Sequence, residues 1–304
     1  MNNFLMAAAE GFISGGVDPR ITNLVPSDIE IRINHFFKPL RWNPSHPSFD
    51  GSNWSVKNIL EIKNGQRILI EGNVFENVWT ADQTGRAIVL KSSNTGGRCF
   101  WCVCADVTFR LNLVKNASGG FSINLGANNP VPPRNISIRD NVWDNIDASE
   151  FGSGARYFVQ ISAGSNFEIN HNTALVTAGR FVIDALGSAT GLVFKNNLLP
   201  HSSLGVKGPG LTLGTPTLNA KYPGHIFIKN VMWDPPGGVT GANYPADNFL
   251  PSLATVQFVN FNSGQNGDYH LQPSSPFKNG GEDGKDIGAD IDAVLSATAG
   301  VVRP

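Results

Sequence analysis

The chain has 304 residues, with 23 Lys and Arg against 24 Asp and Glu, a formal net charge of −1, and only 15% charged residues. So little cationic excess argues against a nucleic acid, and equally against an anionic membrane, as the partner. No apolar run reaches the roughly 18 residues of a membrane span, and residues 1–16 carry Glu10 without a basic flank, so they do not read as a signal peptide.

The chain begins with short apolar segments at residues 3–5 and 11–14 that are typical of β-strands. No capping helix precedes them, although the end strands of a stacked β structure need a cover. We therefore expect that earlier residues, or a second copy of the chain through self-association, cover this end.

A phrase of alternating apolar and polar residues that ends in Asn recurs along the chain. Its copies are Ile29–Asn34, Ile68–Asn73, Val107–Asn112, Ile136–Asn141, Phe167–Asn172, Leu192–Asn197 and a shorter Ile226–Asn230. The Asn residues lie 39, 39, 29, 31, 25 and 33 residues apart. The pattern predicts strands with one buried face, separated by loops of variable length.

A second alternating segment precedes most copies of the phrase, at Leu60–Lys63, Ile88–Lys91, Phe121–Asn124, Val159–Ser162 and Phe181–Asp184. Two short strands in each repeat, without a sustained helical period, predict a solenoid of stacked parallel strands. We expect an all-β parallel β-helix with about eight coils and long loops over residues 1–235. Residues 236–304, rich in Gly, Pro and Asn, are expected to wrap the last coils as a capping segment of the same domain.

The chain has 32 Asn residues, and one of them ends each of these phrases. An Asn at a tight corner can adopt a left-handed conformation, and amides stacked about 4.8 Å apart can pass hydrogen bonds from coil to coil. The alternative is that the amides line a polar cleft for a sugar. Apolar neighbours beside each Asn favour an internal asparagine ladder.

Because of these repeats, residues 2–235 resemble the right-handed parallel β-helix proteins of the pectate-lyase-like superfamily. The closing phrase Gly267–Pro276, followed by Asp286–Asp290, is similar to the tail of many secreted bacterial β-helix proteins. The resemblance implies a right-handed coil and a secreted or periplasmic location. It also implies action on an extracellular polysaccharide as a lyase, hydrolase or epimerase, often with calcium.

The polar residues of the second set of segments point away from the apolar row and should align into one polar strip. Such a strip suits a long polyhydroxylated chain better than a compact metabolite, although a solvated sheet face is the alternative. The strip residues are Glu61, Lys63, Lys91, Ser122, Asn124, Gln160, Ser162 and Asp184.

The Asn phrases present a different outward row, which includes Glu71 and Arg110. A charged row is usually a solvated face, but its basic members, Arg110 among them, could also contact an acidic glycan. An insertion at residues 38–58 brings Trp42 and Trp54, and Trp79 lies in a later loop. These three rings could stack on sugars or pack their loops onto the coils.

Two kinds of catalysis fit the strip. Lys91-Ser92-Ser93-Asn94 is similar to the Lys-Ser-x-x-Asn stretch of β-helix lyases of the alginate lyase and chondroitinase B type. This resemblance implies that Lys91 is the base. The next coil lacks the Arg that the family pattern would supply as the acid. A hydrolase instead needs two carboxylates about 5 to 9.5 Å apart. The candidate catalytic residues are Lys91, Asp184, Lys63 and Glu61, with Asp82, Asp140, Asp144 or Asp147 as second carboxylates near Asp184. A non-catalytic carbohydrate-binding, adhesin or scaffold solenoid is the competing hypothesis.

Cys99, Cys102 and Cys104 form the single cysteine cluster. They could be packed thiols, or one could pair with Cys99, whereas a zinc site lacks a nearby fourth ligand. Asp-rich turns offer oxygen ligands for calcium, but the sequence has neither an EF-hand loop nor a nonapeptide calcium repeat. We therefore assign no metal-ligating residue and no certain cofactor.

Overall fold

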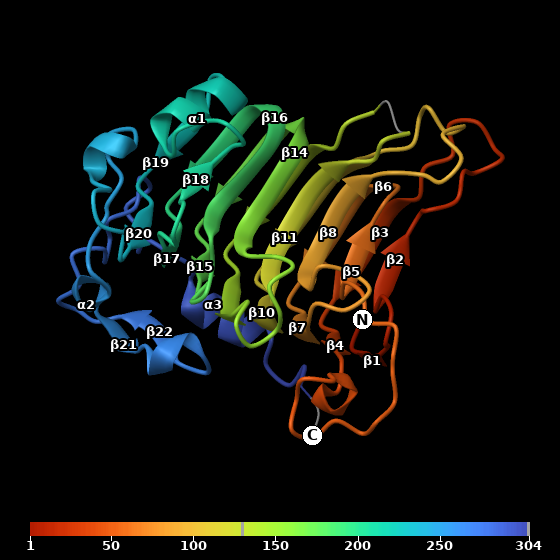
Figure 1. The fold of residues 1–304 in the computed structure, drawn as a ribbon, viewed down its shortest axis with the longest axis horizontal. Helices are drawn as coiled ribbons and strands as arrows, with labels where there is room; N and C mark the ends of the chain where they lie inside the picture. The colour runs from red at the N-terminus through yellow and green to blue at the C-terminus, as the bar shows by residue number, and fades with distance from the viewer. Residues whose placement is uncertain (129–130, 303–304) are drawn as a thin grey trace.

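The computed structural model describes residues 1–128 and 131–302, and two large parallel sheets dominate it (Figure 1). The first sheet has eight strands, in the order β1 (Phe4–Met6), β4 (His35–Phe37), β7 (Val74–Val78), β10 (Leu113–Ala117), β13 (Val142–Ile146), β15 (Thr173–Ala174), β17 (Leu198–Pro200) and β20 (Val231–Trp233).

The second sheet has twelve strands in two halves, which are joined through the long strands β14 (Tyr157–Asn170) and β16 (Phe181–Lys195). One half adds β2 (Phe12–Ser14), β5 (Leu60–Ile62), β8 (Arg86–Ser92), β11 (Gly119–Leu125) and β18 (Val206–Lys207). The other half adds β3 (Ser27–Arg32), β6 (Gly65–Glu71), β9 (Cys104–Arg110), β12 (Arg134–Arg139) and β19 (Ile226–Ile228).

The halves join because the later repeats have lost the loop between their two strands. In β16 the two halves of the sheet meet at Gly187, where a Cβ would lie 1.7 Å from the Ser162 carbonyl oxygen. Only glycine allows the two long strands to approach so closely. The short repeat interval in this region of the sequence is the cause of the continuous strands.

Each repeat of the chain crosses from one sheet to the other and returns. Strands of successive repeats then pair in parallel and in register, as when Phe75 lies beside Phe36 on one side and beside Val114 on the other. Large parallel sheets with this connectivity are compatible with a parallel β-helix.

The predicted asparagine ladder is present. Asn34, Asn73, Asn112, Asn141, Asn172, Asn197 and Asn230 are at most 3% exposed. The Asn73 side-chain amide donates to Asn112 Oδ1 at 3.0 Å, and the Asn112 amide donates to Asn141 Oδ1 at 3.1 Å. The ladder extends beyond the predicted phrases to Asn3 and Asn248. The amides therefore satisfy one another inside the protein and do not line a cleft.

The expectation that the ladder Asn itself adopts the left-handed conformation is wrong. The residue before it does so: Ile33 has φ 55°, Leu111 has φ 54° and Asp140 has φ 52°. The bend at the preceding residue turns the Asn side chain inward, where the amide reaches the next ladder Asn and backbone carbonyls. The satisfied amide offsets the cost of placing β-branched Ile33 in this region.

A second ladder lies four residues after the first and was not identified from the sequence. The Asn116 amide donates to Asn77 Oδ1 and the Asn145 amide to Asn116 Oδ1, each at 2.9 Å. These three Asn residues do have positive φ. The recurring Asn in Val74–Val78, Leu113–Ala117 and Val142–Ile146 was the available signal.

The core between the sheets is built from apolar side chains of both sheets: Phe36, Phe75 and Trp143 come from the eight-stranded sheet, and Phe109 comes from β9 of the twelve-stranded sheet. Phe36, Phe75, Phe109 and Trp143 stack with ring centroids 4.8, 5.7 and 5.8 Å apart. The sequence predicts Trp143 in the core, because it follows Asn141 as Phe75 follows Asn73, and its side chain is fully buried.

The remaining elements are α1 (Thr215–Lys221), α2 (Leu253–Val256), α3 (Ile291–Ala297), the hairpin β21 (Phe258–Asn260) and β22 (Asp268–Leu271), and 3-10 turns at Leu40–Trp42, Gly241–Asn243 and Asn262–Gly264. Leu218 and Tyr222 of α1 enter the main core beside the last strands. The C-terminal segment, blue in Figure 1, packs apolar residues such as Phe258 and Val294 against Val142 and Leu198 on the outer face of the eight-stranded sheet.

Candidate functional site

The predicted strip lies on the face formed by β5, β8, β11, β14 and β16, which run side by side in Figure 1. The strand register gives the row Glu61, Val89, Ser122, Gln160, Asp184 and Lys207. The polar residues therefore align as expected. Val89 interrupts the row, and Lys207 extends it on a strand that the sequence did not indicate.

A parallel row lies two residues further along the strands. Lys91 pairs with Asn124, and the same register places Lys63 and Ser162 at the next positions. Lys63 and Lys91 are partly exposed and about one strand spacing of 4.8 Å apart. The Lys63 ammonium also lies 3.5 Å from the nearly buried Glu61 carboxylate. This end of the strip thus carries two lysines on neighbouring strands, one of which is paired with an acid.

The middle of the strip is a continuous hydrogen-bonded network across four strands. Arg86 Nη1 donates to Ser122 Oγ at 3.0 Å, and the Asn124 amide donates to the same oxygen. Ser122 Oγ donates to Gln160 Oε1 at 3.4 Å, and Gln160 Nε2 donates to Asp184 Oδ2 at 2.8 Å. Ser122 is itself fully buried, so the network holds the partly exposed side chains of Gln160 and Asp184 in place before any ligand binds.

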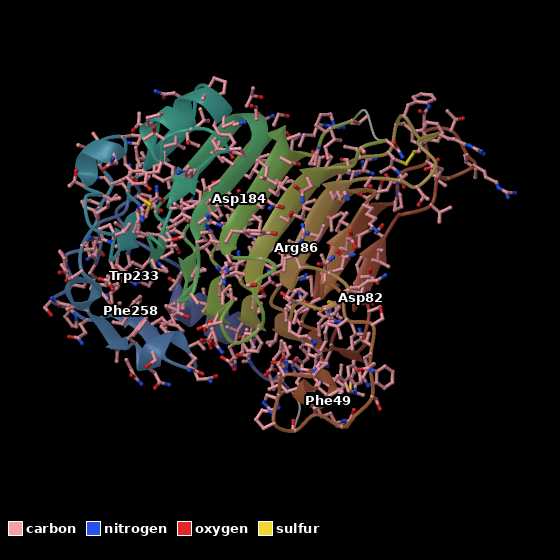
Figure 2. The ribbon with its side chains drawn as sticks, in the orientation of Figure 1. Phe49, Asp82, Arg86, Asp184, Trp233 and Phe258 are labelled. Atoms are coloured by element: carbon pink, nitrogen blue, oxygen red, sulfur yellow. A yellow bond between two sulfur atoms is a disulfide. The ribbon has the colours of Figure 1, made fainter. Side chains whose placement is uncertain are left out.

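Asp184 ends the hydrogen-bonded network and is partly buried. Burial raises the pKa of Asp184 above its usual range, although the Gln160 hydrogen bond and the Arg180 charge act in the other direction. Burial likewise raises the pKa of Tyr157, a nearly buried neighbour of Arg86. Figure 2 shows Arg86 and Asp184 on the same broad face.

Arg86, Tyr157 and Lys207 were missed by the sequence reasoning. Arg86 and Tyr157 stand at the beginning of their strands, two residues before the alternating segments that were used to define the strip. Lys207 is the second residue of the two-residue strand β18, which is too short to show an alternating pattern. The direction of a side chain at the start of a strand depends on how the chain bends there. The alternation of apolar and polar residues does not show that bend.

The three tryptophans do not share one environment. Trp42 and Trp79 are 7% and 2% exposed and pack with Val56 and Phe151 in a separate apolar cluster. Trp54 is 46% exposed and lies against Trp42 with ring centroids 4.8 Å apart. The packing role therefore describes Trp42 and Trp79, and Trp54 is the ring with a face open to solvent.

Arg110 belongs to the other half of the twelve-stranded sheet, in a row with Arg32, Glu71, Arg139 and Asn170. Its guanidinium Nε lies 2.5 Å from Glu71 Oε2, and Arg32 lies 2.6 Å from Glu71 Oε1. Two cations share one carboxylate here, which lowers the pKa of Glu71 against the effect of burial. The structure does not bring Arg110 to the strip.

The other proposed carboxylates are engaged elsewhere. Asp144 accepts hydrogen bonds from the Tyr269 hydroxyl and the Asn266 amide under the C-terminal segment, and burial raises its pKa. Asp147 holds the turn at Ser149 and Thr177, and Asp82 accepts a hydrogen bond from Ser55. Asp140 pairs with Arg139.

The strip's own carboxylates are also well separated. Glu61 and Asp184 are four strands apart, which is about 19 Å. That separation exceeds the 5 to 9.5 Å of a glycosidase pair.

The cysteines divide between two states. Cys99 and Cys102 form a disulfide, and Cys104 is a buried free thiol whose pKa burial raises to about 12. Within residues 1–128 and 131–302, no three His, Cys, Asp or Glu side chains gather closely enough to hold a metal ion.

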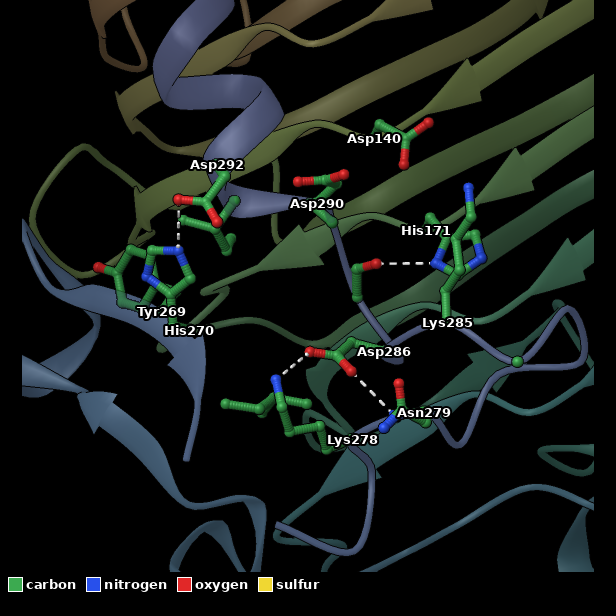
Figure 3. Close-up of a pocket in the computed structure, with 15 residues that line it drawn as sticks. Asp140, His171, Tyr269, His270, Lys278, Asn279, Lys285, Asp286, Asp290 and Asp292 are labelled. Atoms are coloured by element: carbon green, nitrogen blue, oxygen red, sulfur yellow. Dashed lines mark hydrogen bonds and ion pairs between the residues drawn. The ribbon is translucent and has the colours of Figure 1, made fainter. Parts of the chain in front are cut away.

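A cavity of about 320 Å³ lies away from the strip, between the C-terminal segment and the eight-stranded sheet (Figure 3). In it His270 Nε2 lies 3.2 Å from Asp292, Lys278 Nζ lies 3.0 Å from Asp286, and His171 Nδ1 lies 2.9 Å from the Gly288 carbonyl. The first two contacts thus join parts of the C-terminal segment to each other, and the His171 contact ties the segment to the turn before β15.

In the part of the chain that the structure describes, no helix has the length and apolarity needed to cross a membrane. No protein-family model and no curated protein matches this chain.

Proposed function

We propose that this chain is a right-handed parallel β-helix of about eight coils that binds an extended polysaccharide outside the cytoplasm. The observation that carries the proposal is the in-register polar strip, with its network from Arg86 through Ser122 and Gln160 to Asp184. A long ligand with many hydroxyl groups matches donors and acceptors that repeat at strand spacing. The Cys99–Cys102 disulfide supports an oxidising, extracytoplasmic location.

Charge placement favours a lyase-like reaction over glycoside hydrolysis. The distance of four strands between Glu61 and Asp184 leaves a hydrolase without its carboxylate pair. Lys63 and Lys91, by contrast, lie side by side on the strip. Lys63 could neutralise a uronate carboxylate while the unprotonated amine of Lys91 takes the C5 proton; a C4–C5 double bond then forms, the C4–O glycosidic bond breaks, and the leaving oxygen takes a proton from water. In this proposal Lys91 is the base, Lys63 offsets the uronate charge, and Asn124 and Ser162 bind the sugar.

The test is incubation of the protein with a panel of neutral and acidic glycans, with and without a chelator. Ultraviolet absorbance reports unsaturated uronates, a reducing-end assay reports any cleavage, and affinity electrophoresis reports binding. We expect unsaturated products from an acidic glycan. Lys91→Gln should slow their formation about a hundredfold while binding persists, and Lys229→Gln, at a distant corner, is the matched control.

Other results would assign other functions. Reducing ends without unsaturation would indicate a hydrolase, and binding without any product would indicate the non-catalytic solenoid. Failure to bind every glycan in the panel would contradict the proposal itself.

A further inference from the structure

Two loops project beyond the edge of the sheets at the upper right of Figure 1: residues 15–26, between β2 and β3, and residues 93–103, between β8 and β9. Their tip presents an apolar surface to solvent, which we call the tip patch. Its members are Val17, Ile21, Leu24, Phe100 and Trp101. Four of them are 81%, 66%, 48% and 64% exposed, in that order, and Trp101 is half-buried. Apolar side chains gathered in this way mark a contact surface more often than isolated exposed ones do.

The tip patch is held in place from below. The Cys99–Cys102 disulfide brackets Phe100 and Trp101, and the Trp101 indole donates to the Leu24 carbonyl at 3.3 Å. The Arg98 backbone amide donates to Asp18 Oδ2 at 2.8 Å, and the Thr95 amide donates to the Gly16 carbonyl at 3.1 Å. These contacts join the two loops, so the exposed rings are fixed outward and cannot fold back onto the protein.

The charge around the tip patch is locally positive although the whole chain carries a net charge of −1. Arg20 and Arg98 are exposed and, with Trp101, line an open cavity of about 520 Å³. The one acid of this cavity, Asp18, is engaged by the Arg98 amide through one oxygen, and its other oxygen is buried. An occupant with an apolar body and an anionic head matches this combination.

We propose that the tip patch docks on an anionic lipid surface. Apolar and aromatic side chains on a projecting, stapled loop suit the boundary between acyl chains and headgroups, and arginines beside them suit the lipid phosphates. The tip patch stands on loops that project beyond the sheets, with its open cavity beside Arg20 and Arg98 (Figure 2, where the disulfide is the yellow bond at the upper right). The proposal is independent of the glycan-binding function of the strip.

The test is co-sedimentation of the full chain with phosphatidylcholine vesicles, with or without phosphatidylglycerol. We expect binding to vesicles that contain phosphatidylglycerol, and the double variant Ile21→Ser with Phe100→Ser should lower the partition coefficient about tenfold. Arg20→Gln with Arg98→Gln should weaken binding to the anionic vesicles and reduce its dependence on salt. Leu186→Ser with Val259→Ser, two side chains that are similarly exposed elsewhere, is the control and should leave binding unchanged.

Each variant is first compared with the parent by circular dichroism and thermal unfolding, so that a folding defect is recognised. Absence of sedimentation with anionic vesicles would overturn the proposal. Sedimentation that the tip variants do not change would also overturn it. Loss of glycan retention in the tip variants, with vesicle binding intact, would assign the patch to the polysaccharide site instead.

Discussion

Gln160 donates a hydrogen bond of 2.8 Å to Asp184 from the neighbouring strand, and burial raises the pKa of this carboxyl group. The amide is itself held by Ser122, so it cannot turn away when Asp184 changes its charge. The pair therefore joins the polar surface to a titratable group that burial makes reluctant to ionise.

Asp184→Asn should raise the stability of the protein at neutral pH. The folded-state pKa of Asp184 lies above its unfolded value, so the folded state binds the proton more tightly, and the parent loses stability as the pH rises through that folded pKa. Thermal unfolding from about pH 3 to pH 8 should show a variant that is more stable above the pKa and equal to the parent below about pH 4. An unchanged or lower melting temperature at pH 7 would contradict this assignment.

Asp147→Asn is the matched control with the opposite sign. Hydrogen bonds from Ser149 and Thr177 hold the pKa of Asp147 below its usual range despite burial. Its stabilisation is present above the unfolded pKa and is lost as the pH falls through the folded one. The variant should therefore be less stable than the parent at pH 7, and the difference should disappear in acid.

Asn112→Ala should lower the free energy of unfolding by about 3 kcal/mol. Its side chain accepts hydrogen bonds from the Asn73 backbone and side-chain amides and donates to the Ile70 and Arg110 carbonyls and to Asn141, all at a fully buried site. Removal leaves several buried groups without partners. Denaturant titration measures the loss.

The control for the ladder is Asn135→Gly. Asn135 is exposed and has φ 54°, which glycine adopts freely, and its side chain bonds only to Asp106 and Asn166 at the surface. We expect a change below about 1 kcal/mol. Equal losses for the two variants would argue that the buried ladder adds nothing beyond a surface contact.

Thiol counting tests the cysteine assignment. Cys104 is buried and burial raises its pKa to about 12, so the folded protein should resist alkylation. Unfolding without a reductant should expose this single thiol, and unfolding with a reductant should expose all three cysteines, as read by mass spectrometry. Three reactive thiols without a reductant would exclude the disulfide.

His270→Asn should weaken the C-terminal segment below neutral pH. Burial alone would lower the pKa of His270, but the carboxylates of Asp268 and Asp292 outweigh it and raise the pKa. The stabilisation is complete below the unfolded pKa and is lost as the pH rises through the folded one. Other charged groups around the same cavity are Asp140, His171, Lys278, Lys285, Asp286 and Asp290.

Hydrogen exchange of β22 and α3 provides the measurement for this variant. At about pH 5.5 the variant should exchange faster than the parent, and the two should converge by about pH 9. A difference that stays constant across this range would show that the imidazole acts by packing and not by charge.

The sequence determined the parallel strands, the buried ladder and the alignment of the strip. Each of these depends on a local rule that is repeated: period two selects a buried face, and Asn at one position of every repeat finds the Asn of the next repeat at strand spacing. Trp143 could be placed in the core for the same reason, because it follows Asn141 as Phe75 follows Asn73.

Only the tertiary structure decided which side chains meet outside the repeat. The pairing of Arg110 with Glu71, the burial of Trp42 against Phe151, and the cover of the eight-stranded sheet by residues 249–301 all join segments whose separation follows no period. Loop length and the bends at strand starts set these contacts. A sequence pattern predicts neither the path of a loop nor the bend at a strand start, and these contacts depend on how far each loop reaches in space.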